Sequence, residues 1–522
     1  MTRRPSRGPL RAAIALIVVA ATTSVAPCAR LAFAQPSTRV ETPLARAERL
    51  IASGQFDAAR ASIDRILADD PASARGHYLR GTLLERQHDL PGAATEFRTA
   101  IEHDPSLARA HDRLGFVLGL EGKTEEALGE FERAVALQPD LADAQYHLGA
   151  TRWWTRQVDA ARAPLERAVA LRPTHAESRY YLGLIKRQQG DLAGAADDLR
   201  AAVAVDPKLA VAHLQLCATL QAWGDIDGAI LALERAVTLD PSRADAPNSL
   251  GLALMQKGDA ARAVRTLRDA VERHPDFGSA RLNLGTALLQ AGDVDGALGT
   301  YLELTRREPS NAEAFYDLGL ALKQKDDFDG AETAFRTALR LDPTMPEAPY
   351  SLGVVLWQTG RADEAIAMVR ESISRKPDYA EAHYMLGTIF KQRNENGPAL
   401  DEFREAIRIN DRMPEAYTSI GQMLTAAPDG TGAADAFAHA ERLNRIKADS
   451  QAAIFAMNAG LELLKQNEPL KAIAKFREAV RLAPDNAQAH YQLALALRRR
   501  GARAEALAEY NAARRLAPYL RW

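Results

Sequence analysis

The chain has 522 residues, a formal net charge of −2 and two cysteines. The near balance of 66 basic and 68 acidic side chains gives no electrostatic basis for binding nucleic acid or an anionic membrane surface. Two cysteines also exclude a fold that is held together by a framework of disulfides.

Residues 1–34 differ in composition from the rest of the chain. They carry five arginines and no acidic residue, an apolar run from Ala12 to Ala26, and then Ala32-Phe33-Ala34 before Gln35. This is the order of a secretory signal peptide, so cleavage is expected after Ala34, leaving residues 35–39 as a short tail. The alternative is an uncleaved amino-terminal anchor, although the run is shorter than the ~20 residues of a membrane span.

From residue 40 onward the sequence repeats with a period of 34 residues. Proline recurs at this interval from Pro71 to Pro377 and again at Pro484 and Pro518, and alanine recurs from Ala93 to Ala399. A glycine follows ten residues after most of these prolines. Such a period is typical of a repeat architecture, and about fourteen repeats fit the chain.

Each repeat has the pattern of two antiparallel helices. Between residues 278 and 311, Leu284 and Leu288 share one helical face, and Tyr301 and Leu304 lie on one face of the next helix. Gly292 suits the left-handed end of the first helix, and a proline ends the second. Capping boxes are predicted to open four first helices, at Thr174 with Glu177, Ser310 with Glu313, Thr344 with Glu347, and Asp378 with Glu381.

The register slips once. Asp411 stands where a proline is expected, and five extra residues near Ile446 to Ser450 precede Gly460. A longer helix or a kink is expected there. The predicted domains are a main array over residues 40–452 and two final repeats over residues 453–522. The last repeat lacks a capping helix, so it is expected to expose apolar surface, to dock a partner or to form a homo-oligomer contact.

These columns resemble the tetratricopeptide repeat family, in which Leu-Gly, Tyr or Leu, Gly, Ala, Phe, Ala and Pro recur over 34 residues. With the signal-like segment, the resemblance is to exported bacterial members of that family. It implies an all-α fold, a right-handed superhelical solenoid of antiparallel helix pairs whose first helices line a concave groove. It also implies a scaffold that binds a protein or peptide.

No pattern of residues indicates catalysis, a cofactor or a metal site, so the protein is not expected to be an enzyme. Cys217 replaces the glycine that lets two helices pack closely, which favours a structural role. Gly122-Lys123-Thr124 lacks the earlier glycine of a phosphate-binding loop. Histidines in one shared column are typical of packing; they are His77, His111, His213, His383 and His490.

Aromatic residues of the first helices are the candidates for binding a partner in the groove, because their rings give a large contact area at low entropic cost. Beside Trp153 and Trp154, Arg152 and Arg156 replace the usual leucine and glycine, which suggests local specialisation. The alternative role for the tyrosines is packing between repeats. The candidates are Tyr78, Phe116, Tyr146, Trp153, Trp154, Tyr180, Tyr316, Tyr350, Trp357, Tyr384 and Tyr491.

The leading hypothesis is a non-enzymatic scaffold that binds a polypeptide in the concave groove, in the periplasm or elsewhere in a bacterial envelope, or secreted. One alternative is a periplasmic subunit of an envelope export or polysaccharide-secretion machine. Another is an accessory to glycosyl transfer, similar to the repeat domain of O-linked N-acetylglucosamine transferase. Only Asn283 and Asn458 match the asparagine ladder of that domain. No nucleic acid partner and no membrane span after signal cleavage are expected, and use of the concave or the convex face stays open.

Overall fold

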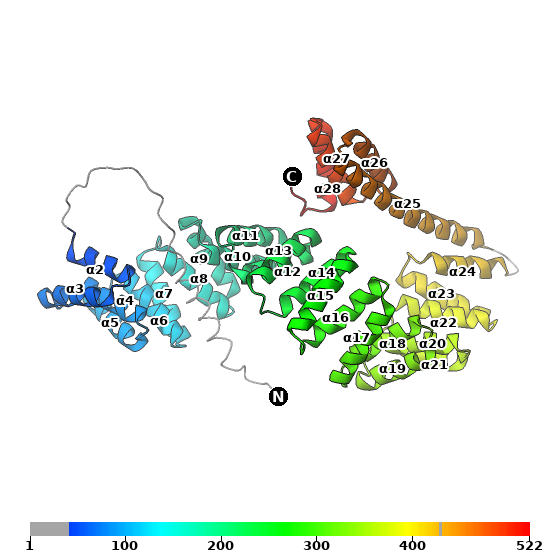
Figure 1. The fold of residues 1–522 in the computed structure, drawn as a ribbon, viewed down its shortest axis with the longest axis horizontal. Helices are drawn as coiled ribbons and strands as arrows, with labels where there is room; N and C mark the ends of the chain where they lie inside the picture. The colour runs from blue at the N-terminus through cyan, green and yellow to red at the C-terminus, as the bar shows by residue number, and fades with distance from the viewer. Residues whose placement is uncertain (1–40, 427–430) are drawn as a thin grey trace. The chain divides into compact units, whose positions relative to one another are not determined.

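The computed structural model describes residues 41–426 and 431–522, which form helices α2 to α28 (Figure 1). The predicted signal peptide and the tail at residues 35–39 lie outside the described residues. The chain divides into two compact units, unit 1 up to Ala222 and unit 2 from Trp223. The described residues contain helices and no strand, so the predicted all-α fold of helix pairs is confirmed.

Unit 1 contains the helix pairs of the first repeats and ends within α12. Its helices are α2 (Pro43–Ala52), α3 (Phe56–Asp69), α4 (Ala74–Arg86), α5 (Leu90–His103), α6 (Ala108–Leu120), α7 (Thr124–Leu137), α8 (Ala142–Trp154), α9 (Val158–Leu171), α10 (Ala176–Gln188), α11 (Leu192–Val205) and α12 (Ala210–Trp223).

The helix pairs continue in unit 2. The first helix of each pair carries an even number as far as α24. The helices of unit 2 are α13 (Ile226–Leu239), α14 (Asp245–Lys257), α15 (Ala260–Arg273), α16 (Gly278–Gln290), α17 (Val294–Arg307), α18 (Ala312–Gln324), α19 (Phe328–Leu341), α20 (Glu347–Gln358), α21 (Ala362–Arg375), α22 (Ala380–Gln392), α23 (Asn396–Ile409), α24 (Pro414–Thr425), α25 (Ala433–Lys465), α26 (Pro469–Leu482), α27 (Ala487–Arg499) and α28 (Arg503–Leu516).

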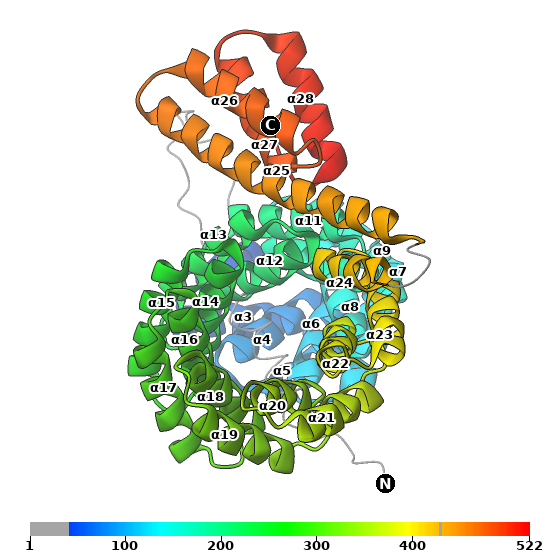
Figure 2. The same ribbon diagram turned by 90° about the vertical axis from the view of Figure 1, so that its right-hand side faces the viewer.

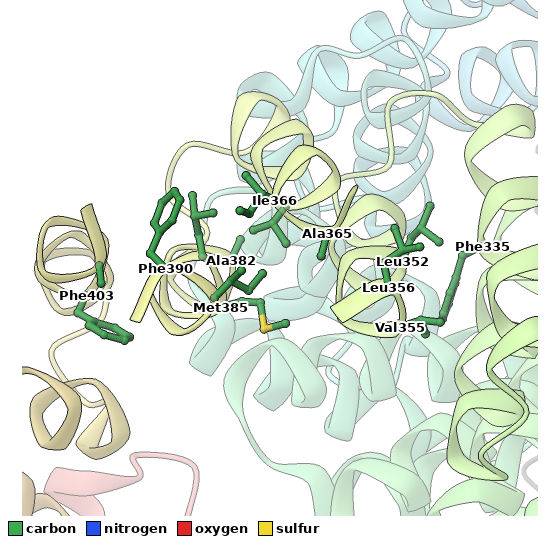
Figure 3. Close-up of a cluster of buried hydrophobic side chains, with 14 of the residues drawn as sticks. Phe335, Leu352, Val355, Leu356, Ala365, Ile366, Ala382, Met385, Phe390 and Phe403 are labelled. Carbon is green, nitrogen blue, oxygen red and sulfur yellow. The ribbon is translucent and has the colours of Figure 1, made fainter. Parts of the chain in front are cut away.

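The glycine column brings the two helices of a pair together. A Cβ atom at Gly319 of α18 would lie 2.6 Å from the ring of Phe335 in α19, which is closer than van der Waals contact allows. Phe335 is fully buried, and the apolar core continues from it through Leu352 and Leu356 to the following pairs (Figure 3). The core is therefore a continuous layer between stacked repeats rather than one globular centre.

The turns within the pairs need a left-handed residue. Gly292 has φ 83°, as predicted, and ends α16. Arg156 and Asp326 occupy the same turn in other repeats with φ 65° and 60°, a conformation that disfavours side chains other than those of Asn and Asp.

The histidine column joins each repeat to the preceding one. His383 Nε2 lies 3.2 Å from the carbonyl oxygen of Pro377, and Nδ1 lies 2.6 Å from Glu402 Oε2. Arg281 donates to the carbonyl oxygen of Pro275 at the same place in another repeat. The predicted packing role is confirmed.

The predicted capping boxes are wrong. The residue before α10 is His175, whose side chain accepts from the amide of Ser178, and Asn311 caps α18 in the same way. The caps fall after the predicted residues, and Pro346 and Tyr379, which precede α20 and α22, make no side-chain cap. The glutamates assigned to the boxes therefore do not act as partners of an N-cap residue.

The register slip appears as one 33-residue helix, α25, which confirms the expected longer helix. It combines the second helix of one repeat with the first helix of the next, so the predicted boundary at residue 452 lies inside it. Phe437 is 40 % exposed, whereas Phe335 at the same repeat position is fully buried, because α25 continues as one helix and no separate first helix of a following repeat covers Phe437. Phe455 is 75 % exposed at a position where Ala314 and Ala382 are fully buried.

The chain's last residues cover the final helix pair. The ring of Trp522 lies 4.3 Å from that of Tyr510, and the hydroxyl of Tyr491 donates to the carbonyl oxygen of Arg521. Leu520 is buried against α27 and α28. The tail therefore covers part of this pair, whereas Leu507, Leu516 and Trp522 stay 54 %, 45 % and 42 % exposed, as expected of a last repeat that exposes apolar surface.

Candidate functional site

The first helices of the repeats lie on the inner side of unit 2. Figure 2 shows α16, α18, α20 and α22 inside the curve formed by α17, α19, α21 and α23. We call the side chains of α18, α20, α22 and α24 that face inward the unit 2 inner surface. They come mainly from the second, fifth, sixth and ninth residues of each repeat.

The inner side of unit 1 is a network of paired charges. Asp112 Oδ1 lies 2.7 Å from His147 Nδ1, and both residues are buried. Arg113 donates to Glu85 Oε1 over 3.3 Å, and Arg172 donates to Asp143 over 2.8 Å. Burial raises the pKa of Glu85. The first two pairs connect successive repeats and the third joins the two helices of one repeat, and all three use charges that could otherwise meet a ligand.

The aromatic candidates of unit 1 are mostly engaged in packing. Phe116 and Tyr146 are 8 % and 6 % exposed, and Trp154 Nε1 donates to the hydroxyl of Tyr181 over 3.0 Å. Trp153 and Tyr180 are partly buried against the apolar cluster that contains Tyr146. Tyr78 is partly buried beside Phe97. Burial leaves Phe116 and Tyr146 little surface to offer a partner.

The specialised repeat in unit 1 also uses its two arginines structurally. Arg152 donates to Glu132 and to the carbonyl oxygen of Ala160, and Arg156 occupies the left-handed turn. These contacts account for Arg152 without a ligand.

The tyrosine candidates of unit 2 form a row across successive repeats. The hydroxyl of Tyr316 lies 3.3 Å from Ser351 Oγ, and the rings of Tyr350 and Tyr379 are 5.1 Å apart. Tyr316, Tyr350 and Tyr384 are only partly buried, so each presents an edge to solvent. The structure thus brings these three predicted residues onto one surface.

The polar row at the other end of these helices links neighbouring repeats. Trp357 Nε1 donates to Gln392 over 2.7 Å, and Lys391 Nζ donates to Gln422 Oε1 over 2.7 Å. Asn283, one of the two residues that match the asparagine ladder, donates to Asn248 of the preceding repeat. These groups therefore join repeats to one another.

Carboxylates without partners border the tyrosine row, a feature that the sequence analysis missed. Among the described residues, none of these side chains makes an ion pair or hydrogen bond: Glu313, Glu347, Glu381, Glu415 and Asp317. Burial, together with the charge of Glu313, raises the pKa of Asp317 to about 7. The 34-residue spacing of Glu313, Glu347, Glu381 and Glu415 was visible in the sequence, but the first three were assigned to helix caps.

The surface ends in a hollow of about 320 Å³ at α22, α24 and α25. The carboxylate of Glu415 gives the hollow a negative charge, and Tyr384 gives it an aromatic ring. Ser419 is only 9 % exposed and its hydroxyl has no partner. The lining residues are Tyr384, Pro414, Glu415, Thr418, Ser419, Gln422 and Asn444.

The remaining groups that could take part in a reaction or bind a metal are enclosed or scattered. Cys217 is buried, and burial raises the pKa of its thiol to about 12, which fits the predicted structural role. Within residues 41–426 and 431–522, no three His, Cys, Asp or Glu side chains gather as they would around a metal ion. None of the helices in this part of the chain is long and apolar enough to cross a membrane.

Comparisons with known proteins give family models and solved structures. A model described as tetratricopeptide repeat matches residues 44–108, 151–210 and 457–520. A model described as the cilia and flagella-associated protein 70 C-terminal domain matches residues 245–457. No curated protein sequence matches the chain.

Three solved structures illustrate the similarity. MamA from Desulfovibrio magneticus RS-1 is 25% identical, with 33% of this chain and 96% of that chain covered and a TM-score of 0.30. YrrB, described as a TPR protein with an unusual peptide-binding site, is 25% identical, with coverages of 37% and 97% and a TM-score of 0.32. Yeast Tom70 is 14% identical, with coverages of 78% and 96% and a TM-score of 0.39. The 34-residue pattern, the helix pairs and the matched family model show that this chain belongs to the tetratricopeptide repeat family.

Proposed function

We propose that the protein is a non-enzymatic scaffold that binds a polypeptide partner along the unit 2 inner surface, in a bacterial envelope compartment. The observation that carries the proposal is the hollow beside Tyr384 together with the row of partly exposed tyrosines leading to it. These groups extend over four repeats instead of converging on one enclosed cavity, which suits an extended chain better than a small molecule.

Site-specific photo-crosslinking in the native cells tests this proposal. A photoreactive amino acid replaces Gln422, which lines the hollow, or Leu302, which is 48 % exposed on the second helix α17. We expect a polypeptide to be crosslinked from position 422 and not from position 302. Crosslinking from position 302 alone, or equally from both positions, would place the partner elsewhere.

The proposed compartment is supported by the order of residues 1–34, which is that of a signal peptide. Fractionation of the native cells with sequencing of the amino terminus tests it. A chain beginning at Gln35 in the envelope fraction is expected, whereas a chain that keeps residues 1–34 in the cytosol contradicts it. Co-purification with an outer-membrane pore would instead favour a subunit of an export or polysaccharide-secretion machine.

A further inference from the structure

We infer that the unit 2 inner surface takes a polypeptide segment carrying lysine or arginine side chains, one of which enters the hollow between α22, α24 and α25. This inference rests on the proposed function and adds the chemistry of the partner.

The hollow is lined by groups that can hold a cation, and none of its lining side chains is itself a cation. The carboxylate of Glu415 has no partner among the described residues, and the nine-tenths buried Ser419 hydroxyl is free to accept. The nearby Lys391 donates to Gln422, and no basic side chain lines the hollow. A carboxylate, a hydroxyl and an aromatic face together suit a guanidinium or an ammonium group.

Further carboxylates extend the same chemistry along the surface. Glu381, Glu347 and Glu313 follow at intervals of one repeat, so an extended segment meets a negative charge at each step. An acidic residue in the first turn also stabilises its own helix, which by itself accounts for the glutamates. It does not account for Asp317, which lies a turn further along α18, partly buried and without a partner. Burial makes the charged form of this carboxyl costly, and a cation that meets it would stabilise that form.

One aromatic side chain near this surface already contacts a cation. Lys376 Nζ lies 4.9 Å from the centre of the Tyr379 ring, and that ring packs against Tyr350. An ammonium group therefore lies over an aromatic ring that packs against a member of the row.

Fluorescence anisotropy with the full chain tests the inference. The probes are two labelled ten-residue peptides, one alternating lysine with serine and one alternating glutamate with serine. The test variant is Glu381→Gln/Glu415→Gln, and a second variant, Ser419→Leu, fills the hollow without changing the charge. The control is Asp329→Asn, which removes an equally exposed, unpaired acid from the second position of α19, a helix on the outer side.

We expect the lysine peptide to bind and the glutamate peptide not to bind. The double variant should weaken binding about ten-fold, since two charge pairs are lost, and added salt should weaken binding to the wild type. Ser419→Leu should also weaken it, and Asp329→Asn should not. Equal binding of both peptides, or an unchanged affinity of the double variant, would overturn the inference.

The crosslinking experiment separates this inference from the proposed function. If position 422 captures a polypeptide whose crosslinked segment contains no lysine or arginine, the proposed function stands and the inference fails. If position 422 captures nothing, the proposed function itself fails.

Discussion

The inner sides of the two units both carry acidic side chains but use them differently. In unit 1, Asp112 is bonded to His147 and Asp143 to Arg172. In unit 2, Glu347 and Glu381 have no such partner. The helix pairs are alike, so the difference comes from the side chains alone. Unit 1 uses its charges to join repeats, whereas unit 2 leaves them accessible.

The largest expected effect is loss of the buried pair in unit 1. Asp112→Ala should lower the free energy of unfolding by about 3 kcal/mol, because it leaves the buried His147 without its partner and removes one of the two carboxylates beside Arg113. Glu381→Ala should change stability little, because that side chain is exposed and unpaired. Urea unfolding followed by circular dichroism measures both. If both variants lost the same free energy of unfolding, the paired carboxylate of unit 1 and the unpaired one of unit 2 would contribute equally to stability.

A second prediction concerns the framework that the units share. Gly149→Val and Gly319→Val should each destabilise the chain by about 2 kcal/mol, because the new side chain overlaps Leu165 or Phe335. Gly129→Val is the control, since a Cβ there meets nothing within 4 Å. A large difference between the first two variants in urea unfolding would mean that the helix pairs of the units are not equivalent.

Histidines should give the units opposite responses to pH. Burial lowers the pKa of His175 in unit 1 to about 4, so stability falls as the pH drops from the ordinary value of 6.5 towards 4. The hydrogen bond that His383 Nδ1 donates to the carboxylate of Glu402 raises the pKa of His383 in unit 2. That contribution to stability is complete below pH 6.5 and is lost as the pH rises through the raised pKa.

Thermal unfolding from pH 4 to pH 9 measures these responses. His175→Gln should reduce the acid-side loss, and His383→Gln should reduce the alkaline-side loss. If each variant kept the wild-type pH profile, the two histidines would not be the groups responsible.

The smallest expected effect is a gain at the turn of the repeat that contains Trp153 and Trp154. Arg156→Gly should raise the free energy of unfolding by about 0.5–1 kcal/mol, because glycine adopts φ 65° without steric cost. Asp326→Gly in unit 2 should gain less, since aspartate tolerates this conformation better. Urea unfolding compares them. A loss of stability in Arg156→Gly would indicate that the arginine side chain makes a contribution larger than the backbone strain.

The sequence predicted the repeated contacts well and the local ones poorly. A small residue at the position of Gly319 and a large apolar residue at that of Phe335 recur at fixed spacing in the other repeats, so their contact follows from periodicity. The longer helix at the slip followed from the five extra residues near Ile446. The capping boxes failed because a cap depends on the backbone angles of one residue, and His175 could not be distinguished from Thr174 by spacing.

The groove candidates show the same limit. Tyr316, Tyr350 and Tyr384 share a surface because they recur every 34 residues. Ser419 and Asn444 meet in one hollow only because α25 continues past the place where other repeats turn. No spacing rule covers a place where the repeat is broken.

The amino-acid sequence by itself determined the helix pairs, their number and their order, because close packing demands small residues at periodic positions in every repeat. Only the tertiary structure decided which carboxylates are neutralised. Asp112 meets His147 across two repeats, whereas Glu381 meets no cation, and this depends on side-chain directions between neighbouring helices that a periodic pattern does not specify.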